Sequence, residues 1–493
     1  MAAGLPRPHH VLLLHLFLLC LCCAFHMAPT TATAAAAGGS DGDGASALLG
    51  LLQRVQTEAL RALGPDGFDA KLYVDLPLAT DERAAAAALP GRATSRAELE
   101  SYLARYFGAA GSDLVAADPP DFEAEPRGFL PRVGSPQARA WALEVHALWK
   151  DLTRRVAPGV AARPERHTLL PLPGRVVVPG SRFREVYYWD SYWVVRGLLV
   201  SKMYDTAKDI VLNLVYMVEK YGFVLNGARS YYTNRRNSTD MTTLATTYII
   251  PVDLNTFIFK MEWDIAAFAK LVGEDTTSEK FIDASKARHL AIDSILWNSE
   301  MEQWLDYWLP TDGDCQQGVY QWKSDSQNRK IFASNFIPLW LNAHHSGSVQ
   351  FADAAKSERV MASLQTSGLL HAAGIATSLT NTSQQWDFPN GWAPVQHLIV
   401  EGLLHSGSEE TRKLAEDIAT RWVRTNYAAY KATGAMHEKY DVEACGKSGG
   451  GGEYKPQTGF GWSNGVVLSF LEEFGWPEDK EIDCSRRGEI GLA

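Results

Sequence analysis

The sequence is poor in cysteine, and this excludes a disulfide framework. It has six cysteines among 493 residues, and three of them lie together between residues 20 and 23 in an apolar N-terminal run. The other three, Cys315, Cys445 and Cys484, are far apart and form no CxxC metal pair. At most one bridge can form among these three, and we expect structural or unpaired cysteines.

Positive charge is also in short supply, which excludes nucleic acid as a partner. There are 47 Lys and Arg against 57 Asp and Glu, a formal net charge of −10, and no block of five or six basic residues occurs. Nucleic-acid binding needs such a basic patch. His344-His345 has no acid or cysteine at ligand spacing, so we predict no metal and no cofactor. A small or neutral partner is expected.

No apolar run is long enough for an ordinary membrane span. The run Val11 to Phe25 is shorter than the roughly 20 residues that a span needs. It follows a short polar start and leads into an Ala/Thr-rich stretch, which predicts a signal peptide over residues 1–37, with a signal anchor through residues 11–25 as the alternative. Sequons at Asn237 and Asn381 fit a secretory route. We expect an extracellular, apoplastic or plasma-membrane-anchored protein.

Strand patterns are few, the clearest running from Arg175 to Val178, whereas helix-period apolar stripes recur along the chain. A Gly/Ser/Asp linker at 38–45 precedes them. An all-α chain of this length favours paired helices in a ring or solenoid over a bundle. No fixed-period repeat is visible, which disfavours a consensus-repeat solenoid. The stripes are Leu48-Leu52-Val55-Ala59-Ala62, a helix opened by Ser95 and Glu98, Trp141-Val145-Leu148-Leu152 after Ser135-Pro136, Ile210-Leu214-Met217-Tyr221, Leu254-Ile258-Met261-Ile265-Phe268, and Leu414-Ile418-Trp422.

Tryptophan is abundant, with 15 residues, and it recurs beside carboxylates. Sugar rings stack on aromatic faces while acids hold their hydroxyls, so this pairing indicates a carbohydrate site. A glycosidic bond is hydrolysed between two carboxyl groups. The Trp-Asp pairs are Trp189-Asp190, Trp263-Asp264 and Trp386-Asp387.

Four loop-like segments combine Trp, Gly, Arg and acids in this way. They predict a polyol pocket, but two alternatives stay open. Arg182, Arg184, Glu185 and Asp190 could form a buried ion-pair network, and the four glycines at 449–452 could be a flexible linker rather than a loop that closes over a ligand. The segments are 179–190, 226–232, 385–392 and 438–462.

Together these segments resemble the trehalase family, glycoside hydrolases that split α,α-trehalose into two glucose molecules. PGSRFREVYYWDSYW (179–193) resembles the first signature of the family, with Ser181 where Gly is usual, and QWDFPNGWAP (385–394) matches the second. EKYDV, GGGGEY and GFGWSNGV (438–466) match the C-terminal motif. The resemblance extends from about residue 45 to 477, is closest to plant members, and implies an (α/α)6 toroid.

The resemblance also implies roles for individual residues. It places the general base, which activates water, on Glu438. The family inverts the anomeric centre, so a base-to-acid gap of about 6.5 to 9.5 Å is expected. Substrate-binding roles fall on Arg182, Trp189, Asp190, Asn226, Arg235 and Glu453, and pocket-lining roles on Trp386, Asp387 and Trp462.

The general acid of the family is missing from this chain. It is the Asp of a motif like ESGWDFS, and neither that string nor an RPES-like segment occurs here. The match stops after Arg235 and resumes at Met241. Roughly a hundred family residues are absent near 236–240, a helix pair or more at ordinary helix lengths, and a toroid that lacks them need not close. Asp240 stands at this junction, but nothing in the sequence places it opposite Glu438.

These observations predict a signal segment (1–37), a linker (38–45), a helical toroid catalytic domain (46–478) and a C-terminal tail (479–493). The expected activity is inverting hydrolysis of trehalose without a cofactor. It is expected to be impaired, because a general acid contributes about 10²- to 10⁴-fold. The alternatives are a catalytically inactive trehalose-binding or regulatory protein and a non-functional product of a skipped exon.

Overall fold

The computed structural model describes residues 41–64, 67–91, 95–224, 248–309, 322–344, 351–452 and 454–484. These residues fall into two compact units. The first lies within Met1–Arg127, His146–Ser238 and Gly459–Gly461, and the second within Gly128–Val145, Thr239–Thr458 and Trp462–Ala493. The boundary at Val145 falls inside helix α6 (Pro136–Leu152), so this helix contributes residues to both units.

The first unit consists of helices with one small sheet. Its three strands are antiparallel in the order β1-β2-β3, with Leu114 opposite Val156 and Thr153 opposite Val177. The predicted strand at Arg175 to Val178 is confirmed as β3. The elements are α2 (Asp41–Leu63), α3 (Ala70–Val74), α4 (Glu82–Ala88), α5 (Arg96–Tyr106), β1 (Leu114–Ala116), β2 (Thr153–Val156), α7 (Pro158–Ala162), η2 (Pro164–Arg166), β3 (Val176–Val177), α8 (Tyr188–Val200) and α9 (Tyr204–Tyr221).

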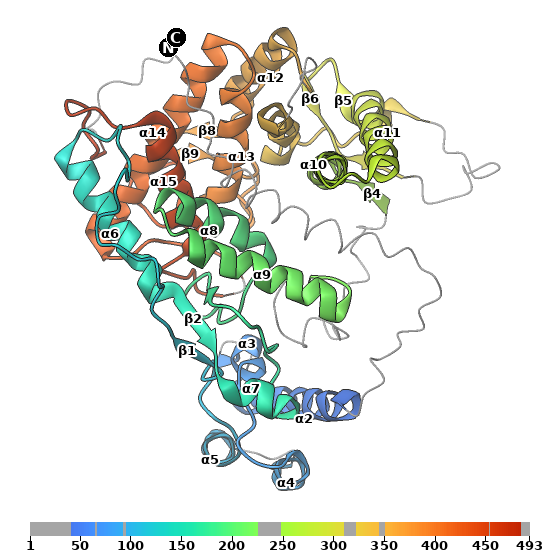
Figure 1. The fold of residues 1–493 in the computed structure, drawn as a ribbon, viewed down its shortest axis with the longest axis vertical. Helices are drawn as coiled ribbons and strands as arrows, with labels where there is room; N and C mark the ends of the chain where they lie inside the picture. The colour runs from blue at the N-terminus through green and yellow to red at the C-terminus, as the bar shows by residue number, and fades with distance from the viewer. Residues whose placement is uncertain are drawn as a thin grey trace. The chain divides into compact units, whose positions relative to one another are not determined.

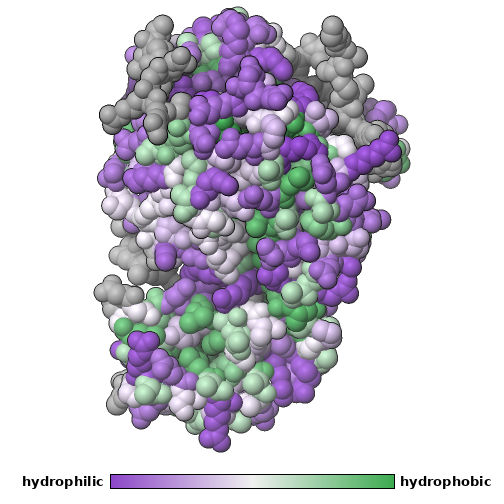
Figure 2. All heavy atoms as spheres, turned by 90° about the vertical axis from the view of Figure 1, so that its left-hand side faces the viewer, coloured by the Kyte–Doolittle hydropathy of each residue, from purple (hydrophilic) through white to green (hydrophobic). Residues whose placement is uncertain are grey.

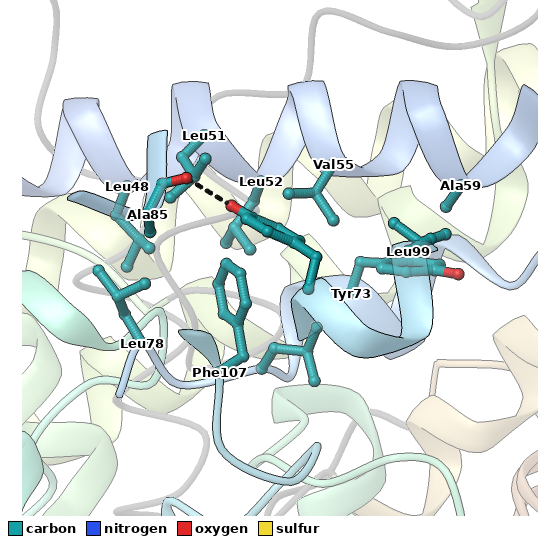
Figure 3. Close-up of a cluster of buried hydrophobic side chains, with 12 residues drawn as sticks. Leu48, Leu51, Leu52, Val55, Ala59, Tyr73, Leu78, Ala85, Leu99 and Phe107 are labelled. Carbon is teal, nitrogen blue, oxygen red and sulfur yellow. Dashed lines mark hydrogen bonds between the residues drawn. The ribbon is translucent and has the colours of Figure 1, made fainter. Parts of the chain in front are cut away.

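Helix α2 contributes the core of the N-terminal helices. Its predicted stripe is buried, and α3, α4 and α5 pack against it through Tyr73, Ala85 and Leu99 (Figure 3). The Tyr102 hydroxyl donates to the Ala85 carbonyl at 2.8 Å, which joins α5 to α4. The helix begins at Asp41, so the last residues of the stretch expected as a linker are helical.

This group also leaves some apolar surface in water. Leu60, Leu72 and Val115 are each more than 40% exposed. In the lower part of Figure 2, at the height where Figure 1 draws the N-terminal helices, green hydrophobic residues lie among purple hydrophilic ones. Within the described residues no helix is both long and apolar enough to cross a membrane.

The second unit is built from long helices joined by short two-residue strands. Helix α10 packs along α11, and α13 packs against both α14 and the 3-10 helix η8 (Figure 1). The elements are β4 (Ile249–Ile250), α10 (Val252–Leu271), α11 (Asp275–Ala291), η6 (Ile292–Leu296), β5 (Trp297–Asn298), β6 (Gln303–Trp304), β7 (Tyr307–Trp308), η7 (Ser324–Ser326), η8 (Ala333–His344), α12 (Ala354–Thr366), β8 (Leu370–His371), β9 (Gly374–Ile375), β10 (Asn390–Gly391), α13 (Ala393–Leu404), α14 (Glu409–Thr433), β11 (Tyr440–Asp441) and α15 (Gly461–Phe474).

The predicted helix boundaries agree with the structure because local capping chemistry sets them. Ser95 and Glu98 form both hydrogen bonds of a capping box at the start of α5. Helix α9 ends at Gly222, whose φ of 81° is the left-handed conformation that glycine adopts without strain. The described residues are thus mainly helical, and the all-α prediction is confirmed.

Helix α10 departs from its predicted pattern. The expected core stripe included Leu254, but Leu254 is 42% exposed, and Leu271 at the end of the helix is 75% exposed. The buried positions of α10 include Lys260 and Asp264, whose side chains form an ion pair at 2.5 Å. The predicted stripe is therefore only partly the buried face: its Met261 is buried and its Leu254 is exposed, while the Lys260–Asp264 pair takes up part of the buried surface.

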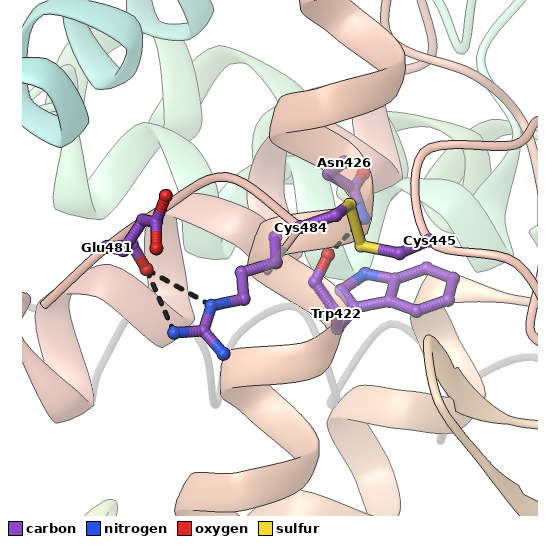
Figure 4. Close-up of a disulfide and its surroundings, with 6 residues drawn as sticks. Trp422, Asn426, Cys445, Glu481 and Cys484 are labelled. Atoms are coloured by element: carbon purple, nitrogen blue, oxygen red, sulfur yellow. Dashed lines mark hydrogen bonds between the residues drawn. A yellow bond between two sulfur atoms is a disulfide. The ribbon is translucent and has the colours of Figure 1, made fainter. Parts of the chain in front are cut away.

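Two of the three dispersed cysteines are joined. Cys445 and Cys484 form a disulfide and lie 39 positions apart in the chain (Figure 4). This is the one bridge that the three cysteines allow, and it makes Cys445 and Cys484 structural cysteines. Arg424 of that helix donates to the Glu481 carbonyl at 3.0 and 3.1 Å beside the bridge. Cys315 lies outside the described residues.

Candidate active site

The segment 179–193 carries three of the predicted substrate-binding residues in the first unit. Strand β3 leads into a tight turn at Ser181, whose φ of 45° lies in the left-handed region. Glycine is favoured at such a φ, which gives a physical reason for the glycine usual at this position. Helix α8 then starts at Tyr188, so Trp189 and the buried Asp190 both lie in its first turn.

Arg182 makes a two-point ion pair with Asp69. Arg182 Nε donates to Asp69 Oδ2 at 3.1 Å, and Nη2 donates to Oδ1 at 2.6 Å. Asp69 is also the N-cap of α3, where it accepts the Lys71 backbone N–H. Partial burial raises the pKa of Asp69, but the hydrogen bonds and charge of Arg182, together with Lys71, outweigh it and hold that pKa below its usual value. A carboxylate from the N-terminal helices therefore orients this guanidinium.

A second, buried set of charges holds the same segment. Lys71 Nζ donates to Asp75 Oδ1 at 2.6 Å and to Glu185 Oε2 at 2.8 Å. The Glu185 side chain is fully buried and that of Asp75 is nearly so. The alternative of a buried ion-pair network is thus realised for Glu185. Sequence reasoning identified neither Asp69 nor Lys71, and the one available signal was the N-cap position of Asp69.

Glu438, the predicted general base, lies in the second unit just before strand β11 and is 1% exposed. The Tyr454 hydroxyl donates to Glu438 Oε1 at 2.6 Å, and the Gln457 backbone N–H donates to Oε2 at 3.0 Å. Donors on both oxygens fix the orientation of the carboxylate. A fixed orientation toward the attacking water is one property that a general base needs.

Three tryptophan rings pack on one another, and one of them contacts the backbone of Glu438. Trp386 is 41% exposed and stacks on the buried Trp392, with ring centroids 4.1 Å apart and planes 10° apart. The Trp462 ring meets Trp392 edge to face at 5.5 Å, and its Nε1 donates to the Glu438 carbonyl at 2.8 Å. Trp386 therefore presents an apolar face, whereas Trp462 supports the backbone of the base.

Asp387 ties together the loop that carries Trp386. Ser378 Oγ donates to its Oδ1 at 3.0 Å, and the Thr382 hydroxyl donates to Oδ2. The next strand, β10, pairs with β11 in antiparallel register, with Asn390 opposite Asp441. This pairing connects the loop to the strand that follows Glu438.

The four glycines at 449–452 form a packed loop. The Gly450 N–H donates to Asn390 Oδ1 at 3.0 Å, and the Gly452 N–H donates to the Ser383 carbonyl at 2.8 Å. Gly451 has a φ of 70°, and a Cβ there would collide with the Ser383 backbone. The flexible-linker alternative is therefore wrong, because the backbone at Gly449, Gly451 and Gly452 lies too close to the 383–390 loop for side chains.

The structure brings Glu438, Trp386, Asp387 and Trp462 together in the second unit. In the first unit Arg182, Trp189 and Asp190 lie on one segment. The hydrogen bonds of Tyr454 and Gln457 to Glu438 are seen only in the structure, because such contacts leave no pattern in the sequence. The predicted residues Asn226, Arg235 and Glu453, as well as Asp240, lie outside the described residues. In the part of the chain that is described, no cluster of three or more His, Cys, Asp or Glu side chains could hold a metal ion.

Comparison with solved structures supports the fold. The neutral trehalase from Saccharomyces cerevisiae matches with a TM-score of 0.51 at 19% identity, covering 68% of this chain and 94% of that one. At this identity the likeness speaks for the fold alone, and it agrees with the expected helical toroid class.

Comparison with known sequences identifies the family. A probable trehalase from Oryza sativa subsp. japonica is 66% identical over 551 residues, covering 89% of this chain and 98% of that protein. A trehalase from Arabidopsis thaliana is 40% identical over 556 residues, covering 89% and 87%. The family model for trehalase matches residues 67–238 and 236–475. Together with the geometry around Glu438, these matches show that the chain belongs to the trehalase family of glycoside hydrolases.

Proposed function

We propose that this protein acts on α,α-trehalose by the inverting two-carboxylate mechanism, with Glu438 as the general base. The observation that supports this most directly is the buried Glu438 carboxylate with hydrogen-bond donors on both oxygens. In this mechanism Glu438 removes a proton from water as the water attacks the anomeric carbon. A general acid must at the same time protonate the glycosidic oxygen, so that glucose leaves as an alcohol and not as an alkoxide.

The segment that carries this acid is absent from the chain, and two features of the comparisons support that proposal. The family match is split into two parts, which meet at residues 236–238. The alignment with the Oryza sativa relative extends over 551 residues, more than the 493 residues of this chain. Because nearly all of that relative is covered, the relative has residues that this chain lacks.

Exposed apolar residues on both sides of the junction agree with a missing segment. Leu212 and Phe223 precede it, and Leu254 follows it, each at least 40% exposed. Large apolar side chains on a helix ordinarily have packing partners.

Without the acid, we expect weak turnover or none. A general acid contributes about 10²- to 10⁴-fold, and a sugar alkoxide is a poor leaving group. The second candidate function is therefore trehalose binding without hydrolysis, as a binding or regulatory protein. A product of a skipped exon would show the same chemistry.

The decisive experiment measures binding and turnover on one preparation. Calorimetry with trehalose and a glucose-release assay are carried out on the chain as written. The same assays follow on a variant that carries the Oryza sativa relative's residues between the positions matching Arg235 and Met241. We expect binding with little glucose from the first protein and a gain of about 10²-fold or more from the second. Full turnover by the chain as written would contradict the missing-acid proposal, and no activity with the insertion would contradict the trehalase assignment of the site.

A secretory location is part of this proposal. The Cys445–Cys484 bridge supports it, because disulfides persist mainly in oxidising compartments. The sequon at Asn381 lies on an exposed loop, whereas Asn237 and the apolar run at 11–25 lie outside the described residues. Sequencing the N-terminus of the secreted protein would separate a cleaved signal peptide from a membrane anchor.

A further inference from the structure

Lys439 is a buried cation directly beside the general base. The residue is 1% exposed, and its Nζ donates to the Gly451 carbonyl at 3.0 Å and to the Gln385 carbonyl at 3.5 Å. The ammonium also lies 5.4 Å from the centre of the Trp392 ring, within range of a cation–π contact. One side chain thus contacts the glycine loop, the 383–390 loop and the Trp392 ring.

The backbone of Lys439 reinforces the same connections. Its carbonyl accepts the Gly449 N–H at 2.9 Å, at the opposite end of the glycine loop from Gly452. The charged group that acts on this ammonium is Glu438, the residue just before it in the chain. Asp387 in the 383–390 loop is hydrogen bonded to Ser378 and Thr382, and the four glycines carry no titratable side chain.

A lysine is a poor choice here if stability of the fold is its only purpose. Burial lowers the pKa of Lys439 to about 8, although the charge of Glu438 acts in the opposite direction. A methionine has a similar length and would fill the same space without the desolvation of a charge. The lysine adds directional donors that hold two loops at once.

We propose that Lys439 is a positioning residue that fixes the glycine loop and the 383–390 loop against the chain at Glu438. By holding these two loops in place, it sets trehalose affinity. The inference rests on the proposed trehalose site. Tyr454, which follows the glycine loop, donates to Glu438, so a displaced glycine loop also disturbs the orientation of the base. Trp386, in the 383–390 loop, stacks on Trp392. Without Lys439, Trp392 loses its cation–π contact with the ammonium.

The test compares Lys439→Met with Lys447→Met. Lys447 is a matched control in the same region, since its side chain is 64% exposed and pairs with Asp441 at 2.6 Å. Without ligand, we expect amide hydrogen exchange in 383–387 and 449–452 to be about tenfold faster or more in Lys439→Met, and trehalose affinity to fall by about tenfold or more. The thermal unfolding midpoint is expected to stay equal or to rise. A purely structural lysine would instead lower the midpoint together with the affinity.

Unchanged exchange in both loops, or a midpoint that falls in proportion to affinity, would overturn the inference. If the unmodified protein binds no trehalose, the proposed function fails, and the exchange measurement still decides the role of Lys439. If Lys439→Met does not fold, amine labelling of the unmodified protein with acetic anhydride replaces it. Lys439 should then react about 100-fold more slowly than Lys447, and equal rates would contradict the closed arrangement.

Discussion

Two segments carry most of the family-matched residues that the structure describes, and different forces hold them. Segment 179–193 in the first unit is held by ion pairs with α3, one half-exposed at Asp69 and one buried at Glu185. Segment 437–454 in the second unit is held by neutral donors to Glu438, by backbone contacts of the glycine loop and by a disulfide. In the proposed function, the predicted sugar-binding Arg182 can tolerate water around its partner, whereas the predicted general base Glu438 needs a preorganised surrounding.

The largest expected effect is loss of the bridge behind the second segment. Cys484→Ser should lower the free energy of unfolding by about 4 kcal/mol, because opening a loop of 39 residues gives the unfolded chain more freedom. Urea denaturation measures this loss. Adding a reductant to the unmodified protein should produce the same loss, and Cys315→Ser, outside this bridge, serves as the control. A loss below about 1 kcal/mol would mean that the bridge contributes little to this segment.

The next effect tests the buried ion pair of the first segment. Glu185→Gln should lower the free energy of unfolding by about 2 to 3 kcal/mol, since Lys71 would lose one of its two buried carboxylate partners. Glu165→Gln breaks an exposed pair in the same unit and should cost less than about 1 kcal/mol. Equal losses, measured by the same denaturation, would show that burial does not distinguish these pairs.

The third prediction concerns the pH dependence of the free energy of unfolding, to which Lys439 in the second segment contributes. Because burial lowers the pKa of Lys439 from 10.5 to about 8, the unfolded chain binds a proton that the folded chain does not between these pH values. The contribution of Lys439 to stability therefore rises with pH across this window, by at most about 1.4 kcal/mol per pH unit.

Denaturation at several pH values gives this slope as the difference between the unmodified protein and Lys439→Met. Lys447→Met should show no such rise, because the ion pair with Asp441 raises the pKa of Lys447. A falling difference between pH 8 and 10.5 would mean that the folded protein holds Lys439 in its charged form.

The smallest effect concerns Asp69. Its carboxylate is 46% exposed, so Asp69→Asn should change the free energy of unfolding by about 0.2 to 1 kcal/mol only. Since the pKa of Asp69 is lowered in the fold, this contribution is present above about pH 4 and is lost as the pH falls through the folded-state pKa. In Asp69→Asn, the free energy of trehalose binding should weaken by more than the free energy of unfolding falls. High salt should reduce the difference in stability between this variant and the unmodified protein. A stability loss above about 2 kcal/mol would place this pair with the buried network.

Local chemistry explains which features were predictable from the sequence. The capping box of α5 and the glycine end of α9 act within a few residues, so their patterns can be read directly. The apolar stripe of α10 predicted its buried face only in part, because the helix buries the Lys260–Asp264 pair and leaves Leu254 exposed. Whether an apolar face is covered depends on distant segments, which no local pattern records.

The sequence by itself determined the family and the helical class, since both follow from residue types in a fixed order, and it predicts Glu438 as the general base. It also predicts that the segment with the general acid is missing. Only the tertiary structure decided that Asp69 and Lys71 hold the arginine segment, that Cys445 pairs with Cys484, and that Lys439 connects two loops. These contacts join residues far apart in the chain, and their formation depends on how the backbone folds back on itself.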